Sequence, residues 1–287
     1  MGNMGNLLRA EGRLPEALAD YETVMRFSTE LGHKGYVALC LQAIAEVEAE
    51  KGDLSGVLEK LQQALSIEKQ IGEQSNYASS LVSLGEVFLQ QGEQKKAVDS
   101  EQQALTTQQQ LGEKGSAAES QLALAEAAFD AEKITDAETL VRAALREFQA
   151  EAEPQQEIAA DGLLARILLH QNKISEAQES IAEALKLSQN TPDVVRGLSL
   201  RVDDAYVLAA SSKTVAAEAA GGQAMAEALR LGLIRTNFEA TLALGRIQMR
   251  TNRVAGQARL QRLAKDAQFR GFVLVAREAS ASLSGST

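Results

Sequence analysis

The side chains in this sequence that could bind a metal ion or attack a substrate are few and widely separated. The chain has two histidines, His33 and His170, and one cysteine, Cys40. Protein metal sites usually combine three or four such ligands at short spacings, such as Cys-x-x-Cys or His-Glu-x-x-His, and neither spacing occurs here. A lone cysteine forms no internal disulfide and is usually a small buried apolar residue. We therefore expect no metal, no cofactor and no disulfide.

Motifs for nucleotide binding and nucleophilic catalysis are also missing. The sequence contains no P-loop, no Gly-x-Gly-x-x-Gly loop and no Gly-x-Ser-x-Gly elbow. The tripeptide Gly221-Gly222-Gln223 is similar to the hydrolytic motif of peptide-release factors, but it falls inside a segment whose pattern predicts a helix. Two adjacent helical glycines cost about 2 kcal/mol relative to alanine, so we expect that helix to be weak or bent. The sequence indicates a protein that is not an enzyme.

Composition indicates helices throughout. The 287 residues are 45% hydrophobic, which is enough for a core, and they include only 4% aromatic residues, no tryptophan and three prolines. The abundant Ala, Leu, Glu and Gln are good helix formers. No run of eighteen apolar residues occurs, and the N-terminus lacks the apolar core of a signal peptide. We expect an all-α, soluble and cytoplasmic protein.

Small residues recur every forty positions along the whole chain. Gly or Ala occupies each member of the series Gly5, Ala45, Gly85, Ala125, Ala165, Ala205 and Gly245. Residues that are mostly turn formers follow seven positions later, at Gly12, Gly52, Gly92, Glu132, Asn172, Ser212 and Asn252. Alanines dominate the positions twelve and nineteen after the small residue, from Ala17 and Val24 to Gln257 and Ala264. We predict one unbroken frame of repeats.

Helix packing explains this spacing. A small residue in an apolar stretch lets a second helix approach closely, and two alanines seven residues apart lie near one face of that second helix. Each repeat is therefore predicted to be a helix hairpin. Capping-box spacing at Thr135 and Ser175 indicates where second helices start. One hairpin cannot bury both of its faces, so the hairpins should stack into a solenoid.

The third repeat resembles the tetratricopeptide repeat (TPR), on the residues Leu81, Leu84, Gly85, Phe88, Gly92, Ala97 and Ala104. The resemblance implies an all-α, right-handed TPR superhelix of stacked antiparallel helix hairpins, and a forty-residue period is similar to the longer-helix subclass. On this basis the array consists of a truncated first repeat at 1–35, six further repeats and a capping helix at 272–283. The six repeats are expected at 36–75, 76–115, 116–155, 156–193, 194–233 and 234–271.

Both ends of the sequence suggest a larger context. Met1 aligns inside a leading helix, so we expect a fragment whose first-repeat residues Met4, Leu7 and Leu8 are partly exposed. The segment RLAKDAQFRGFVLVARE near the other end is similar to the C-terminal TPR arrays of bacterial multidomain signalling proteins. The resemblance therefore implies a signalling context.

The TPR resemblance also implies where a partner binds, because the leading helices of that family line a concave groove. The position after each small residue should point into it: Asn6, Glu46, Glu86, Glu126, Arg166, Tyr206 and Arg246. Four residues later, on the same helical face, are Ala10, Glu50, Gln90, Asp130, His170, Ala210 and Arg250. Apolar contacts are expected from Leu89, Leu122, Phe129, Leu169 and Met249. The groove should be acidic in repeats two to four and basic from the fifth repeat, except at the neutral sixth.

Charge suggests the kind of partner. Residues 1–229 carry a net charge of −17 and residues 230–287 carry +7, for a total of −10. The acidic body disfavours nucleic acid, and the apolar residues that a membrane helix would need are required for stacking. We expect a scaffold or regulatory module that binds a protein or peptide, with a basic segment of that partner against the acidic half. A small-ligand sensor domain of a transcription regulator is the alternative. Either solvation or weak head-to-tail self-association would satisfy the opposite charges at the two ends.

Overall fold

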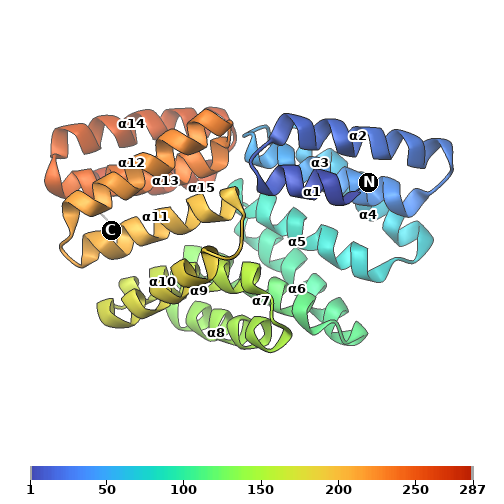
Figure 1. Cartoon of the computed structure of the whole chain (residues 1–287), viewed down its shortest axis with the longest axis horizontal. Coiled ribbons are helices and arrows are strands. Elements are labelled where there is room, and N and C mark those ends of the chain that lie inside the picture. The colour runs from blue at the N-terminus through green and yellow to red at the C-terminus, as the bar shows by residue number, and fades with distance from the viewer. Residues whose placement is uncertain (1, 286–287) are drawn as a thin grey trace.

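The computed structural model describes residues 2–285, which form fifteen α-helices and no strand (Figure 1). The leading helices are α1 (Gly2–Ala10), α3 (Lys34–Glu50), α5 (Gln74–Gln90), α7 (Lys114–Asp130), α9 (Pro154–His170), α11 (Val194–Ala210) and α13 (Ile234–Thr251). The trailing helices are α2 (Leu14–Glu30), α4 (Val57–Ile71), α6 (Gln94–Leu111), α8 (Ile134–Glu151), α10 (Ile174–Ser188), α12 (Thr214–Leu231) and α14 (Arg253–Phe269). A last helix, α15 (Val273–Ser284), packs against α14 and α13. The expected all-α helical-repeat fold is confirmed.

The turns inside the hairpins use a left-handed backbone, as the turn formers in the sequence predict. Six of the seven positions have a positive φ between 58° and 78°, namely Gly12, Gly52, Gly92, Glu132, Asn172 and Ser212. The residue after each of these turns starts a short link into the trailing helix. A left-handed residue ends a helix because it turns the chain away from the helical path while its N–H still bonds to the last turn.

The seventh hairpin departs from this pattern, and the prediction of an unbroken frame was wrong there. Asn252 has a φ of −146°, and its side chain accepts a hydrogen bond from the N–H of Ala255, so it caps α14 directly. The connection between α13 and α14 is therefore a single residue, and α14 enters the core one position early. Gly256 and Leu263 are buried where Gln257 and Ala264 were expected.

One local prediction, on where the trailing helices are capped, also needs correction. Thr135 and Ser175 are the second residues of α8 and α10, which begin without a side-chain cap, so the capping boxes do not form. The helix α12 is continuous through the two glycines. Gly221 is buried there, and a Cβ at this position would lie in ordinary van der Waals contact with Leu244 of α13, at 3.6 Å.

The ends of the solenoid meet, and this closure shapes the interior. The N-terminal helices and the C-terminal helices lie side by side in Figure 1, with α6 to α10 on the opposite side of the ring. One apolar core cluster joins the two ends, because Leu54 and Val57 of the second repeat share it with Phe238 and Phe272. The contact between the two ends thus closes the array into a ring, and the concave surface inside the ring stays partly open to solvent.

Turn glycines make this closure possible. The Cβ that Gly52 lacks would lie 2.7 Å from Cγ2 of Ile234, at the start of α13. Gly12 faces Leu231 and Gly92 faces Val273 in the same way, each at 3.1 Å. Real Cβ atoms do not approach a neighbour at 2.7 Å, so Gly52 serves both the left-handed turn and the contact between the ends of the chain.

The N-terminal helix is partly covered. Met4 and Leu7 of α1 are more than half exposed, as expected, but Leu8 is buried in a cluster with Leu14 and Tyr21. The expectation that Leu8 is exposed was wrong because α2 covers this face of α1. Met1 lies outside the described residues. Within residues 2–285, no helix is long and apolar enough to cross a membrane.

Candidate functional site

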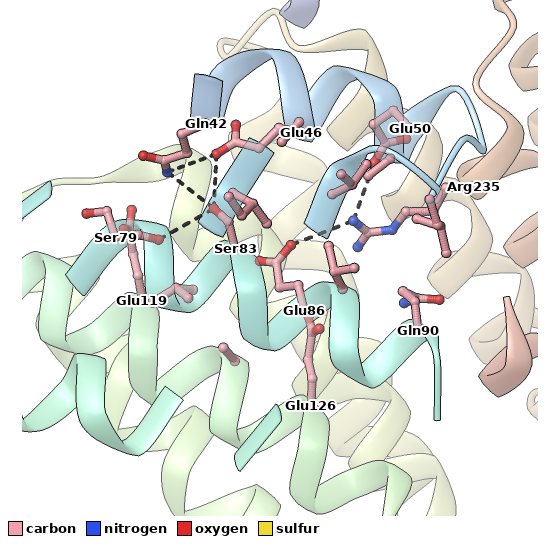
Figure 2. A pocket seen from close by; sticks show the side chains of 18 of the residues that line it. Gln42, Glu46, Glu50, Ser79, Ser83, Glu86, Gln90, Glu119, Glu126 and Arg235 are labelled. Carbon is pink, nitrogen blue, oxygen red and sulfur yellow. Dashed lines mark hydrogen bonds and ion pairs between the residues drawn. The ribbon is translucent and has the colours of Figure 1, made fainter. Parts of the chain in front are cut away.

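The enclosed interior contains a cavity of about 320 Å³ lined by the leading helices α3, α5 and α7 and by the first turn of α13 (Figure 2). Six residues predicted for the groove line it: Glu46, Glu50, Glu86, Gln90, Leu122 and Glu126. They are brought together because one position per forty-residue repeat stacks on the same inner face. The predicted acidic half of the groove is therefore a single compact site in the structure.

Two arginines from distant parts of the chain reach the same cavity. Nη1 of Arg9 on α1 forms an ion pair with Oε2 of Glu46 at 2.7 Å. The guanidinium of Arg235 on α13 lies 3.5 Å from Glu50 and 3.8 Å from Glu86, as Figure 2 shows. The ion pairs of Arg235 cross from the seventh repeat to the second and third, so they depend on the closure of the ring.

A polar wall and an apolar wall complete the cavity. The amide of Gln42 donates to Oε1 of Glu46 at 3.1 Å and to Oγ of Ser83 at 3.2 Å, and Ser83 donates to the same Glu46 oxygen. These contacts orient Glu46 (Figure 2). Leu54 and Phe272 contribute apolar surface where the two ends of the solenoid meet. Such a mixture of apolar walls and converging polar groups is typical of ligand sites.

Two polar groups in the cavity have unused binding capacity. Glu126 makes no hydrogen bond or ion pair with the described residues, although it faces the interior. The side-chain oxygen of Gln90 is buried and accepts no hydrogen bond. A buried acceptor without a donor is costly, so a ligand that donates to Gln90 would gain that missing hydrogen bond.

Burial shifts the titration of these carboxyl groups. It raises the pKa of Glu86 to about 7, and the nearby Glu126 and Glu46 add to the rise while Arg235 opposes it. Burial likewise raises the pKa of Glu126 and of Glu50 above the ordinary value. The side chain of Glu86 is 46% exposed because it faces the cavity. A cation that enters would meet these carboxyl groups with few competing partners.

A further carboxyl group lies directly behind the cavity. Glu101 of α6 is fully buried against Gly85, and neither of its oxygens has a hydrogen-bond partner. Burial raises its pKa to about 8, with smaller contributions from Glu126 and Glu86. The equivalent residues of the neighbouring hairpins are apolar, namely Leu61 and Val141.

The inner surface of the second half is arranged differently. Arg166 of α9 lies 3.9 Å from Asp203 of α11 and stacks over the ring of Phe129 at 5.2 Å. Arg246 of α13 pairs with Glu278 of α15 at 3.5 Å and donates to Tyr206. The predicted basic half of the groove is therefore largely neutralised, because Arg166 and Arg246 each pair with a carboxylate of a neighbouring helix.

The other predicted site residues lie outside the cavity. Asn6 accepts a hydrogen bond from Tyr21, Asp130 pairs with Arg277, and the ring of His170 meets Phe129 edge to face. Leu89 is buried in its own small cluster, and Leu169 and Met249 pack against core clusters. Arg250 is exposed and forms no ion pair with the described residues.

Several cavity residues escaped the sequence prediction. Gln42 and Ser83 lie one turn before the predicted Glu46 and Glu86, and Glu119 lies two turns before Glu126, so helical spacing could have found them. Arg235 lies eleven residues before Arg246 and thus on nearly the same face of α13. Its meeting with Glu50 and Glu86 has no sequence signal, because it depends on how far the superhelix turns.

Neither a metal-binding cluster nor an activated cysteine occurs in the described part of the chain. No group of three or more His, Cys, Asp and Glu residues between 2 and 285 has the arrangement of a metal site. Cys40 is buried, and this burial raises the pKa of its thiol. A raised pKa disfavours the thiolate, which is the nucleophilic form.

Comparisons with known proteins agree with this architecture. Two family models described as tetratricopeptide repeats match residues 1–70 and 122–194. Among solved structures, a Rap protein complexed with competence and sporulation factor is 15% identical with a TM-score of 0.78, over 93% of this chain and 74% of that one. The Rap conjugation regulator of plasmid pLS20, in complex with the Phr* peptide, is 14% identical with a TM-score of 0.79, over 93% and 72%.

A third similar structure is BtubC (BKLC) from P. vanneervenii, 18% identical with a TM-score of 0.57, over 76% of this chain and 90% of that one. Among curated proteins, none matches the chain. At these identities the solved structures support the helical-repeat fold and nothing finer.

Proposed function

Because this chain belongs to the tetratricopeptide repeat family, we propose that it is a scaffold or regulatory module that binds a peptide, or a peptide segment of a partner protein, in the enclosed cavity. The observation that carries this proposal is the pair of unused polar groups, the carboxylate of Glu126 and the side-chain oxygen of Gln90. Of the solved structures of similar fold, one is a complex with the Phr* peptide and another a complex with competence and sporulation factor, which supports binding of a partner by this fold.

The chemistry of the cavity favours a basic segment. Its lining contains five carboxylates, from Glu46, Glu50, Glu86, Glu119 and Glu126, and three arginines, from Arg9, Arg196 and Arg235. Arg9 is already paired at 2.7 Å, and Arg235 is shared among several carboxylates. A Lys or Arg side chain, or a peptide N-terminus, would supply both the missing positive charge and hydrogen-bond donors. The inner surface of the second half is neutralised and offers less to an acidic segment.

Labelled peptides of defined charge test this function. Three pools of fluorescein-labelled hexapeptides, random apart from two fixed residues, would carry fixed Lys, fixed Glu or fixed Ala. We expect fluorescence anisotropy to show binding mainly of the Lys pool, weakening as salt is raised. Glu126→Gln should weaken this binding at least fivefold, because it removes a charge that no protein group satisfies.

The control is Arg250→Gln, which changes an exposed, unpaired charge predicted for the groove but lying outside the cavity. It should leave binding of the Lys pool unchanged. Equal binding of all three pools, or no binding of any, would contradict the proposed function.

A small-ligand sensor is a second candidate, and the size of the cavity supports it. A volume of about 320 Å³ lies at the lower end of small-molecule sites, and apolar walls surround the polar groups. A compact organic cation would satisfy the same carboxylates as a peptide side chain. Competition between such amines and the Lys pool would distinguish this candidate, since a sensor should bind the free amine more tightly than any peptide.

Four finer proposals accompany the main one. We propose a non-catalytic, cytoplasmic protein with a role in bacterial signalling, a proposal that rests on the similarity of its repeats to such arrays. We also propose weak head-to-tail self-association between the acidic body and the basic C-terminal region, because residues 1–229 and 230–287 carry opposite net charges of −17 and +7. Light scattering at low salt and high concentration would show a rise in mass; a constant mass would exclude self-association.

A further inference from the structure

Arg235 occupies the part of the cavity that a ligand's cation would enter. It is the second residue of α13, and its side chain extends from the seventh repeat towards α3 and α5, as Figure 2 shows. Three carboxylates from three helices surround its guanidinium: Glu50 at 3.5 Å, Glu86 at 3.8 Å and Glu239 at 3.4 Å. The side chain is only 27% exposed, so most of its surface is shielded from solvent.

The ion pairs of Arg235 are longer than the other ion pair in the cavity. Arg9 and Glu46 approach to 2.7 Å, whereas no carboxylate comes closer than 3.4 Å to Arg235. Charge-assisted N–H···O hydrogen bonds are normally about 2.7–2.9 Å long. Arg235 is thus held by the combined field of several carboxylates and not by one close, bidentate contact.

On the basis of the proposed function, we propose that Arg235 is an internal competitor of the ligand. It occupies the cation-binding position of the ligand-free cavity and leaves Glu86 when the positively charged group of the ligand enters. Glu86 is the longest of its three contacts, and it lines the same cavity as the unpaired Glu126 on the neighbouring helix α7. The ligand's cation would then lie between Glu86 and Glu126.

The surroundings of Arg235 permit this exchange. Glu239 lies one turn further along the same helix and can keep the guanidinium on α13. Glu50 is held in place by a hydrogen bond from the hydroxyl of Thr236 at 3.3 Å. Arg235 would therefore retain two carboxylates after losing Glu86, and no charged group would be left without a partner.

A competitor of this kind affects only ligands that carry positive charge. It weakens their binding because part of their interaction energy replaces an existing ion pair. A neutral ligand forms no ion pair with Glu86, so its affinity is independent of Arg235. Removal of the guanidinium should thus raise affinity selectively.

Binding of the Lys hexapeptide pool to Arg235→Gln tests this directly, at pH 8 so that Glu86 is mostly ionised in the wild-type protein. We expect Arg235→Gln to bind the Lys pool at least fivefold more tightly than the wild type, and Arg235→Lys to stay close to it. The matched control is Arg230→Gln, which removes an exposed arginine paired with Glu227 outside the cavity. That variant should leave the affinity unchanged.

A ligand-free measurement separates this inference from the proposed function. The side-chain carboxyl signal of Glu86, followed by ¹³C NMR, should titrate at higher pH in Arg235→Gln, because the arginine lowers the pKa of Glu86. An unchanged titration, or peptide binding that is equal or weaker in Arg235→Gln, would overturn the competitor. If neither protein binds any peptide, the proposed function and the competitor both fail, whatever the titration shows.

Folding of the variant must be checked, because Arg235→Gln leaves acidic neighbours without a cation. Far-UV circular dichroism and thermal unfolding would establish this. If Arg235→Gln is unfolded, the double variant Arg235→Gln/Glu239→Gln restores the charge balance and is measured in its place. The same increase in affinity is expected for it, and its absence would count against the competitor.

Discussion

The two halves of the ring interior carry charges at the same helical positions but satisfy them in different ways. In the second half, Arg166 and Arg246 pair with carboxylates of the neighbouring helices α11 and α15. In the first half, Glu50 and Glu86 form no ion pair with an adjacent repeat among the described residues, and both pair with Arg235 of the seventh repeat. The second half is therefore electrostatically self-contained, whereas the first needs closure of the ring or a ligand. Binding capacity is concentrated where local pairing is missing.

The largest expected effect concerns the buried carboxyl group behind the acidic half. Glu101→Leu should increase the free energy of unfolding by roughly 3 kcal/mol at pH 7, because it removes a buried acid with no hydrogen-bond partner. Leucine already occupies the equivalent position of the second hairpin at Leu61. Urea unfolding of both proteins measures the difference.

The stability difference between Glu101→Leu and the wild type should depend on pH. The pKa of Glu101 is about 8 in the folded protein and therefore above its unfolded value, so the folded state holds the proton more tightly. The contribution of this tighter proton binding to the free energy of unfolding is complete below about pH 4.5 and is lost as pH rises through 8. The advantage of Glu101→Leu should therefore grow between pH 5 and pH 8. A constant difference across this range would show that Glu101 is not a buried neutral acid.

The seam between the halves can be tested with two glycines that share a backbone conformation. Gly52 and Gly72 both have a φ of 78°, but only Gly52 faces another part of the chain, at Ile234. Gly52→Ala should cost about 2–3 kcal/mol, combining left-handed strain with steric overlap, whereas Gly72→Ala should cost only about 1 kcal/mol. Equal costs in thermal unfolding would mean that the ends of the ring do not meet closely in solution.

Removal of one acid from each half should have opposite results. Glu278→Gln takes the charged partner from Arg246 and should destabilise the fold by about 1 kcal/mol, since the arginine keeps only its neutral contacts. Glu126→Gln breaks no ion pair and should be neutral or stabilising by a few tenths of a kcal/mol. Chemical unfolding at pH 8 would measure both. Similar losses in the two variants would remove the distinction between the halves.

The smallest expected effect comes from the turns. The first three left-handed turns use glycine at the seam, whereas Glu132, Asn172 and Ser212 adopt the same conformation away from it. Glu132→Gly should therefore stabilise the protein by about 0.5 kcal/mol, after the greater unfolded-state freedom of glycine is allowed for. A loss of stability would indicate that the exposed Glu132 side chain makes a compensating contact in solution.

The sequence by itself determined the elements and the composition of the inner face. Forty-residue spacing of small residues located the hairpins, because a close helix crossing tolerates only Gly or Ala, and Ala97 and Ala104 are indeed fully buried. Helical periodicity also placed Glu46, Glu86 and Glu126 on one face. These features depend only on local geometry, which repeats with the sequence.

Only the tertiary structure decided how many of these residues form one site. The small rotation between successive repeats accumulates over the array, and its sum brings α13 beside α3 and encloses the acidic face. Arg235 and Glu50 are thereby joined across 185 residues of sequence. The one-residue connection at Asn252 also shifts the buried face of α14 by one position. The forty-residue period determines neither the rotation between repeats nor the length of this connection. The rotation depends on the packing of many side chains at each interface between repeats.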